Sequence, residues 1–188
     1  MGSYTTRSLT KSEAKDVIET IRNGYLNHKP NPQVACILVL ESNLGCRIGD
    51  ITKLRTDSFV KDGDTWKINI TEEKTGKKRT FIVAPPVMKF IQKWIDDQGI
   101  LRGDRLFNIN SPAVWKQLRS ATDYLGYEDV SSHSFRKSAS MRIYESTGHD
   151  IEAVREFLQH SSVTTTQSYI RRSSDQLEKA ILSSVEIL

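Results

Sequence analysis

In one segment of the chain the spacing of the apolar residues differs from the rest, and this segment limits the possible folds more than any other feature. Between residues 58 and 83, Trp66, Ile68 and Ile70 alternate with polar residues. A period of two is typical of a half-buried β-strand. Turn signals occur at residues 61–64 and around Gly76. We therefore expect a small antiparallel sheet of about three strands here.

Apolar residues recur at helical spacing in most of the remaining chain. A capping box at Thr10 and Glu13 opens the first expected helix. Asn31 followed by Pro32 opens a second, which is apolar on nearly every side and is therefore expected to be buried. Further helices are expected over residues 47–54, 87–98, 111–125, 132–147, 151–158 and 175–188. The sequence predicts an α+β fold that is mainly helical.

The length and charge of the chain set broad limits. Its 188 residues suffice for one domain with a substantial core. We expect residues 1–8 to be a tag or linker remnant and residues 9–188 to form the domain. The 27 Lys and Arg against 23 Asp and Glu give a formal charge of +4, which suits a nucleic-acid ligand and equally a mildly basic enzyme. No stretch approaches the roughly 20 apolar residues that span a bilayer.

The last third of the chain concentrates residue types that can bind and attack a phosphate. His133 and Arg136 are three residues apart, so on a helix they project from one face. His160 precedes Tyr169 by nine residues, in a run of Ser and Thr that favours a turn and then a short helix. Two imidazoles, a guanidinium and a phenol can together hold a phosphate and supply a nucleophile.

Five elements in order resemble the catalytic domain of the tyrosine recombinases, the phage and transposon integrase family. That family has an arginine in G-x-R-x-x-E/D, a lysine in a β-hairpin, H-x-x-R, and L-G-H-x-x-x-x-T-x-x-Y. The matching segments of this chain are Gly45-Cys-Arg47-Ile-Gly-Asp50, Lys74 in Glu-Glu-Lys-Thr-Gly, His133-Ser-Phe-Arg136, and Leu158-Gln-His160 through to Tyr169. The resemblance extends from about Leu9 to Tyr169. Gln159 stands where the family usually has glycine, so we expect a slightly different turn before His160.

The resemblance implies a role for each matching residue. Tyr169 would attack a backbone phosphate, form a 3′-phosphotyrosyl link and release a 5′-hydroxyl. Arg47 and Arg136 would bind the non-bridging oxygens, because planar guanidinium groups suit a phosphate whose charge grows in the transition state. His160 would donate to the same phosphate. His133 would handle the proton of the tyrosine or hold the phosphate.

Other charged residues have alternative roles. Lys74 matches the family lysine that protonates the leaving 5′-oxygen, and Lys77 or Lys78 takes that role if the hairpin register shifts. Asp50 either orients Arg47 or adds a negative charge to the first turn of a helix. Charged runs are usually solvated surface, but the following residues are candidates for contact with the DNA backbone: Lys77, Lys78, Arg79, Arg171 and Arg172.

The resemblance also implies partners and a location. We expect double-stranded DNA recombination sites as the substrate, a homotetramer on DNA, a monomer for the isolated domain, and a place in the bacterial cytoplasm or nucleoid, with no membrane partner. No cofactor and no metal ion are expected. Family members carry an N-terminal DNA-clamping domain that does not fit before Thr10, so we expect a truncated chain or else a minimal enzyme.

Two other classes of function remain open from the sequence. A type IB topoisomerase-like enzyme shares the arginines, lysine, histidine and tyrosine but relaxes supercoiled DNA. A DNA-binding regulator would use the same scaffold without catalysis. The final helix, residues 175–188, is expected to dock on a neighbouring protomer or on its own domain.

Overall fold

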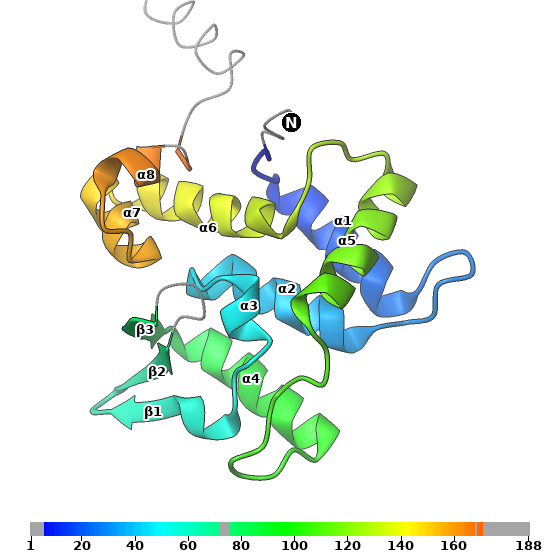
Figure 1. Ribbon diagram of the computed structural model, residues 1–188, viewed down its shortest axis with the longest axis horizontal. Helices are drawn as coiled ribbons and strands as arrows, with labels where there is room; N and C mark the ends of the chain where they lie inside the picture. Colours follow the sequence, from blue (N-terminus) through cyan, green and yellow to red (C-terminus); the bar gives the residue numbers. More distant parts are fainter. Residues whose placement is uncertain (1–5, 72–75, 168, 171–188) are drawn as a thin grey trace, which may run out of the picture.

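The computed structural model of the chain describes residues 6–71, 76–167, 169 and 170. It confirms the expected class, a mainly helical fold with one three-stranded antiparallel sheet (Figure 1). The described elements are α1 (Lys11–Asn23), α2 (Pro32–Leu44), α3 (Ile48–Ile51), the 3₁₀ turn η1 (Thr56–Ser58), β1 (Phe59–Asp62), β2 (Thr65–Thr71), β3 (Lys78–Val83), α4 (Pro85–Gln98), α5 (Ser111–Leu125), α6 (Ser132–Ser146), α7 (Ile151–Leu158) and α8 (Val163–Gln167).

The sheet has the order β1-β2-β3, so β2 is its central strand. Ile68 on β2 pairs with Phe59 on β1 and with Phe81 on β3, and all three are buried. Side chains alternate between the faces of a strand, so this row faces the core while Ile82 is exposed. The sheet ends before Pro85 and Pro86, and Pro85 is also the first residue of α4.

Helix α2 occupies the centre of the helical part. It packs against α1 and α6, and α4 lies on another side of it (Figure 1). Asn31 caps its start by accepting a hydrogen bond from Val34 N at 3.0 Å, and Gly45 ends it in the left-handed conformation. Its apolar residues are buried around most of its circumference, as the sequence predicts. The C-terminal end of α2, at Leu44 and Gly45, is therefore buried inside the domain.

Helices α6, α7 and α8 pack in sequence, α6 against α7 and α7 against α8. Ser131 caps α6 through a capping box with Ser134, and Asp150 caps α7 by accepting from the amides of the first turn. These caps fix where α6 and α7 begin, and therefore where the candidate residues on them lie. The predicted helix over residues 175–188 falls outside the described residues.

The described part of the N-terminus contacts the body of the domain. Arg7 N donates to Asp129 O at 3.0 Å, and the Arg7 guanidinium forms an ion pair with Glu13 at 2.7 Å. This pair lowers the pKa of Glu13 to about 2, and the same carboxylate closes the capping box of α1. The proposed domain boundary after residue 8 stays a prediction.

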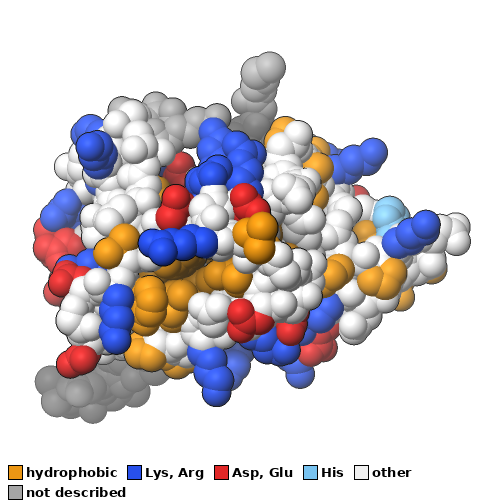
Figure 2. Space-filling view, turned by 90° about the horizontal axis from the view of Figure 1, so that it is seen from below, with side chains coloured by type: hydrophobic (Ala, Val, Ile, Leu, Met, Phe, Trp, Pro, Cys, Tyr) orange, Lys and Arg blue, Asp and Glu red, His pale blue; other side chains and the backbone are white. Residues whose placement is uncertain are grey.

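The molecular surface mixes charge with apolar side chains. Seen from below the view of Figure 1, hydrophobic side chains gather on one face, and Lys and Arg side chains lie around them (Figure 2). Within the described residues, no helix is both long and apolar enough to cross a bilayer.

Candidate active site

Arg136 lies at the centre of the candidate site, in the second turn of α6. It is 1% exposed, although it carries a guanidinium group. Its Nη1 donates to the carbonyl oxygen of Gly45, and its Nη2 donates to that of Leu158 at 3.0 Å. These carbonyls stand at the C-terminal ends of α2 and α7, where the helix dipole favours a cation. One side chain therefore binds the ends of two helices to a third.

His160 lies beside Arg136 and is also buried, at 6% exposed. Its Nε2 is 3.4 Å from Nη2 of Arg136, and its Nδ1 is 3.2 Å from Oγ1 of the buried Thr166. A guanidinium N–H can only donate, so Nε2 is the acceptor in this contact. In the neutral imidazole, Nδ1 then donates to Thr166. Thr166 belongs to α8, so this short helix orients the imidazole.

Tyr169 follows α8 and completes the cluster. Its backbone N donates to Thr166 O at 2.8 Å. Its ring centroid lies 5.1 Å from that of His160 in an edge-on arrangement, and the Arg136 Cζ lies 6.0 Å from the ring. The side chain is only half-buried, so the phenol lies at the border between the cationic cluster and the surface.

Arg47 adds a second guanidinium to the same region. It is the N-cap residue of α3, two positions after Gly45, and it is half-buried. Burial lowers the pKa of Arg136, the Tyr169 phenol opposes this shift, and the positive charge of Arg47 lowers the pKa further. The two guanidinium groups are therefore close enough to repel each other. Such an arrangement is costly alone and favourable when an anion binds between or beside the groups.

Together, Arg47, Arg136, His160 and Tyr169 come from three parts of the chain that meet at the ends of α2 and α7. Comparison with known proteins agrees with this arrangement. The sequence profile of the phage integrase family matches residues 7–176.

The chain belongs to the phage integrase family.

Individual relatives support the same family. The chain is 26% identical over 183 residues to tyrosine recombinase XerA from Pyrococcus furiosus, covering 93% of this chain and 60% of that protein. The crystal structure of a XerA recombinase superposes with a TM-score of 0.72 at 21% identity, covering the whole chain and 67% of the other. XerH bound to a palindromic difH substrate, in a post-cleavage complex, gives 0.71 at 20% identity over 96% of this chain and 53% of that one. At such low identity the solved structures establish the fold alone. The family profile and the named recombinase relatives do not favour the topoisomerase or regulator alternatives.

The remaining predicted residues of this integrase-family chain differ in burial, and some lie beyond the described residues. His133 is in the first turn of α6, as predicted, and is exposed. Asp50 is buried in the first turn of α3, which leaves both of its suggested roles open. Lys74, Arg171 and Arg172 lie outside the described residues.

Of the other basic candidates, Lys77 lies directly before β3, and Lys78 and Arg79 are its first two residues. Lys77 and Lys78 are exposed, and Arg79 is half-buried. Their place on an edge strand leaves the two lysines accessible to a ligand. Contact with DNA stays a prediction for all three.

Sequence reasoning missed Glu41, which is buried at 1% exposed on α2. Burial raises the pKa of this carboxyl well above its ordinary value, and the positive charge of Arg136 opposes the shift. Its Oε2 has no hydrogen-bond partner in the described part of the chain. The available signal was a single carboxylate in the otherwise apolar run that forms α2. Glu41 places a titratable group beneath the arginine of the candidate site.

Gln159 adopts the left-handed conformation at the end of α7, with φ 51° and ψ 42°. Glycine adopts this conformation most readily, which gives a physical reason for the family preference. The amide Nε2 of Gln159 donates to Thr80 O on β3 at 2.6 Å. The turn before His160 is therefore linked to the sheet, a contact that the sequence did not indicate.

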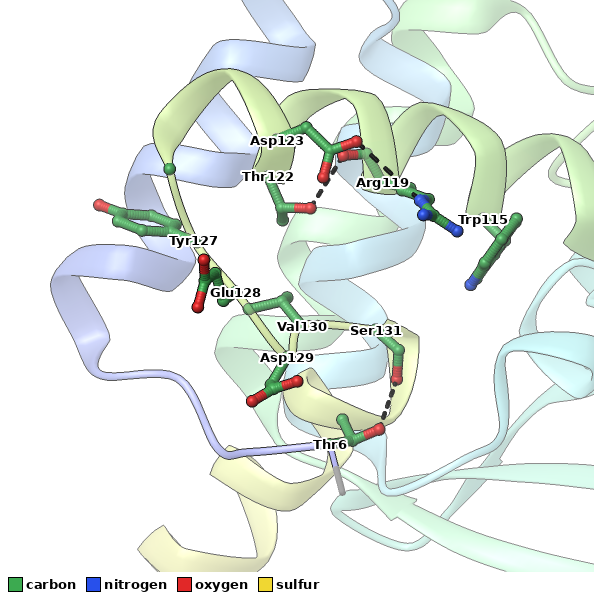
Figure 3. A pocket seen from close by; sticks show the side chains of 11 residues that line it. Thr6, Trp115, Arg119, Thr122, Asp123, Tyr127, Glu128, Asp129, Val130 and Ser131 are labelled. Carbon is green, nitrogen blue, oxygen red and sulfur yellow. Dashed lines mark hydrogen bonds and ion pairs between the residues drawn. The ribbon is translucent and has the colours of Figure 1, made fainter. Parts of the chain in front are cut away.

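A pocket of about 690 Å³ lies elsewhere, between α5, the loop that follows it and Thr6 (Figure 3). The Arg119 guanidinium lies 5.5 Å from the centroid of the Trp115 ring on its rim, and Ser131 closes the other side. The four clustered residues Arg47, Arg136, His160 and Tyr169 do not line it.

Among the described residues, no group of three or more His, Cys, Asp or Glu side chains is placed to hold a metal ion.

Proposed function

We propose that the chain is the catalytic part of a tyrosine-type site-specific DNA recombinase, which cuts and rejoins DNA through a 3′-phosphotyrosyl intermediate. One observation carries the proposal: a half-buried phenol, Tyr169, lies against the buried pair Arg136 and His160. A phenol has an ordinary pKa of about 10, so it attacks well at neutral pH only beside groups that favour its anion. The nearby guanidinium supplies this environment.

The cluster can bind a phosphate without losing its internal contacts. A guanidinium has about five N–H donors, and the carbonyls of Gly45 and Leu158 engage two nitrogens of Arg136. Donors therefore remain for the non-bridging oxygens, and Arg47 supplies more. Positive charge that is already fixed in place stabilises the transition state without reorganisation during the reaction. His160, which accepts from Arg136 and donates to Thr166, would orient that guanidinium toward the same oxygens.

In the proposed reaction the Tyr169 oxygen attacks phosphorus and the bond from phosphorus to the 5′-oxygen breaks. The phenol proton passes to a base, for which His133 is the candidate, and a hairpin lysine protonates the leaving oxygen. Lys74 is the first candidate for that lysine. The 5′-hydroxyl of another strand then attacks the phosphotyrosine and releases Tyr169. One phosphodiester replaces another, so no nucleotide is hydrolysed.

The partners we propose are double-stranded DNA sites. XerH, a structural relative, was solved on a difH substrate, which supports DNA as the ligand. The chain spans about 60% of the XerA sequence it matches, so assembly into a tetramer and recombination between two sites are proposals for the whole protein. We place the reaction in the cytoplasm, where chromosomal DNA is accessible.

The direct test is a search for the covalent intermediate. Nicked duplexes tiled across the DNA that flanks the gene would trap it, because the short strand after the nick diffuses away and cannot rejoin. We expect at least one duplex to give an SDS-resistant adduct that Tyr169→Phe abolishes without loss of DNA binding. Tyr124→Phe is the matched control, since Tyr124 is 51% exposed and lies on α5.

Two outcomes would contradict the proposal. An undiminished adduct in Tyr169→Phe would show that another residue attacks. DNA binding without any adduct across the whole tiled set would favour the regulator class.

A further inference from the structure

Gln159 stands between two parts of the proposed site. It directly precedes His160 in the chain, and its side chain reaches β3. The turn itself is closed by two contacts, from His160 N to Arg155 O at 3.0 Å and from Arg155 Nη1 to His160 O at 2.8 Å. His160 therefore lies on a turn that is held by hydrogen bonds, and the side chain of Gln159 connects this turn to the sheet.

The receiving carbonyl belongs to an edge strand. β3 is the last strand in the order β1-β2-β3, and Thr80 lies two residues after Lys78. Thr80 is also joined to the central strand, because its Oγ1 donates to Asn69 Oδ1 at 2.8 Å. A contact at Thr80 therefore fixes the strand directly after its basic segment, residues 77–79.

The backbone conformation of Gln159 is costly for a residue with a Cβ, whereas glycine would adopt it readily. A local turn alone therefore favours glycine at this position. The glutamine has a long amide that reaches 2.6 Å from a carbonyl on another element. The contact explains why an unfavourable residue type occupies the turn.

We propose that Gln159 is a positioning residue, which holds the basic start of β3 in register with His160 and Arg136. Resting on the proposed function, its role is to set the described lysine candidates, Lys77 or Lys78, beside the leaving 5′-oxygen while the helical cluster holds the phosphate. The amide does not touch the substrate. It acts by fixing the distance between two elements that do.

Two variants separate this role from a local turn preference. Gln159→Gly relieves the left-handed backbone and removes the amide. Gln159→Glu keeps the length but places a carboxylate, which cannot donate when ionised, against the Thr80 carbonyl. Gln98→Glu is the matched control, because Gln98 is exposed at the end of α4.

The first measurement needs no DNA. Amide hydrogen exchange at residues 79–81 is expected to become faster in Gln159→Gly and Gln159→Glu but not in Gln98→Glu. Unchanged exchange in both Gln159 variants would overturn the proposal, even if the chain proved not to cleave DNA. This measurement therefore distinguishes failure of the positioning role from failure of the proposed function.

The second measurement uses the leaving group. A 5′-bridging phosphorothioate leaves as a thiolate and needs no proton. We expect Gln159→Gly to slow cleavage of ordinary DNA about tenfold and to leave cleavage of the phosphorothioate within about twofold, as loss of aligned general-acid catalysis requires. Equal slowing of both substrates, or no slowing of either, would overturn the proposal, because a merely structural role would not distinguish them.

Discussion

The helical part of the site and its sheet part are held in place in different ways. Arg136 and His160 are buried, and they bond to helix-end carbonyls and to a buried threonine. Lys77 and Lys78 are exposed at the edge of a small sheet, where the amide of Gln159 links β3 to the helical part. The groups proposed to bind the phosphate are therefore fixed in advance, whereas the segment proposed to move a proton is held by a surface contact. Charges that are already fixed in place stabilise a transition state best, so rigid phosphate-binding groups suit the proposed reaction.

The largest effect is expected where the helical part depends on one side chain. Arg136→Ala leaves two carbonyls without their donor and removes the positive charge that partly offsets the desolvation of Glu41, so we expect a loss of about 3–5 kcal/mol in the free energy of unfolding. Chemical denaturation measures this loss. Arg136→Lys keeps the charge without the planar fork and should recover only part of it.

Lys77→Ala is the corresponding change in the sheet part. A change within about 0.5 kcal/mol is expected, as for other exposed surface positions. Similar losses in Arg136→Ala and Lys77→Ala would remove the contrast between the two parts.

Two glycines with the same positive φ give a matched comparison. Gly45 directly follows α2 and lies against Phe157 of α7, whereas Gly76 precedes β3. Both glycines have φ +65°. An added Cβ at Gly45 would lie 2.8 Å from Cζ of Phe157, whereas at Gly76 it would meet nothing within 4 Å. We expect Gly45→Ala to cost about 2–4 kcal/mol of stability, from strain and overpacking, and Gly76→Ala only about 1 kcal/mol. Thermal unfolding of both variants tests this, and equal shifts in Tm would contradict close packing at the helical part.

A smaller effect is expected from the pH dependence of Glu41. Its pKa is raised in the folded state above the ordinary value of 4.5, so the folded protein retains a proton that the unfolded chain has lost. Stability from this group is fully present below about pH 4.5 and falls as pH rises toward the folded pKa, by at most about 1.4 kcal/mol per pH unit.

Glu41→Gln should therefore flatten the fall in unfolding free energy between pH 5 and pH 8, measured with urea. Gln98→Glu provides an exposed carboxylate for comparison. An unchanged slope in Glu41→Gln would show that Glu41 is ionised and compensated by Arg136.

Much of the fold could be predicted because its signals are local. The capping residues Thr10, Asn31 and Asp150 each mark the start of a helix, since a side-chain oxygen satisfies amides of the first turn. The alternation at Trp66, Ile68 and Ile70 predicted the central strand. These patterns depend on residues a few positions apart and can be read without knowledge of the tertiary structure.

The site was only partly predictable, because its contacts join distant residues. The spacing of His133 and Arg136 predicted a common helix, but not that Arg136 would be buried and His133 exposed. The burial of Glu41 depends on packing between α2 and α6, and the link from Gln159 to Thr80 spans 79 residues. Such pairings follow from how the helices and sheet pack, which periodicity alone does not encode.

Peptide mapping of the trapped protein–DNA adduct tests most directly the central claim, that Tyr169 beside the buried cationic cluster is the nucleophile. Trypsin cutting after Arg155 and Arg171 releases residues 156–171, in which Tyr169 is the sole tyrosine among several serines and threonines. Mass spectrometry of the nuclease-trimmed adduct is predicted to find a 3′-linked nucleotide phosphate on Tyr169. A phosphate on one of the serines or threonines, or on a peptide from another part of the chain, would contradict it.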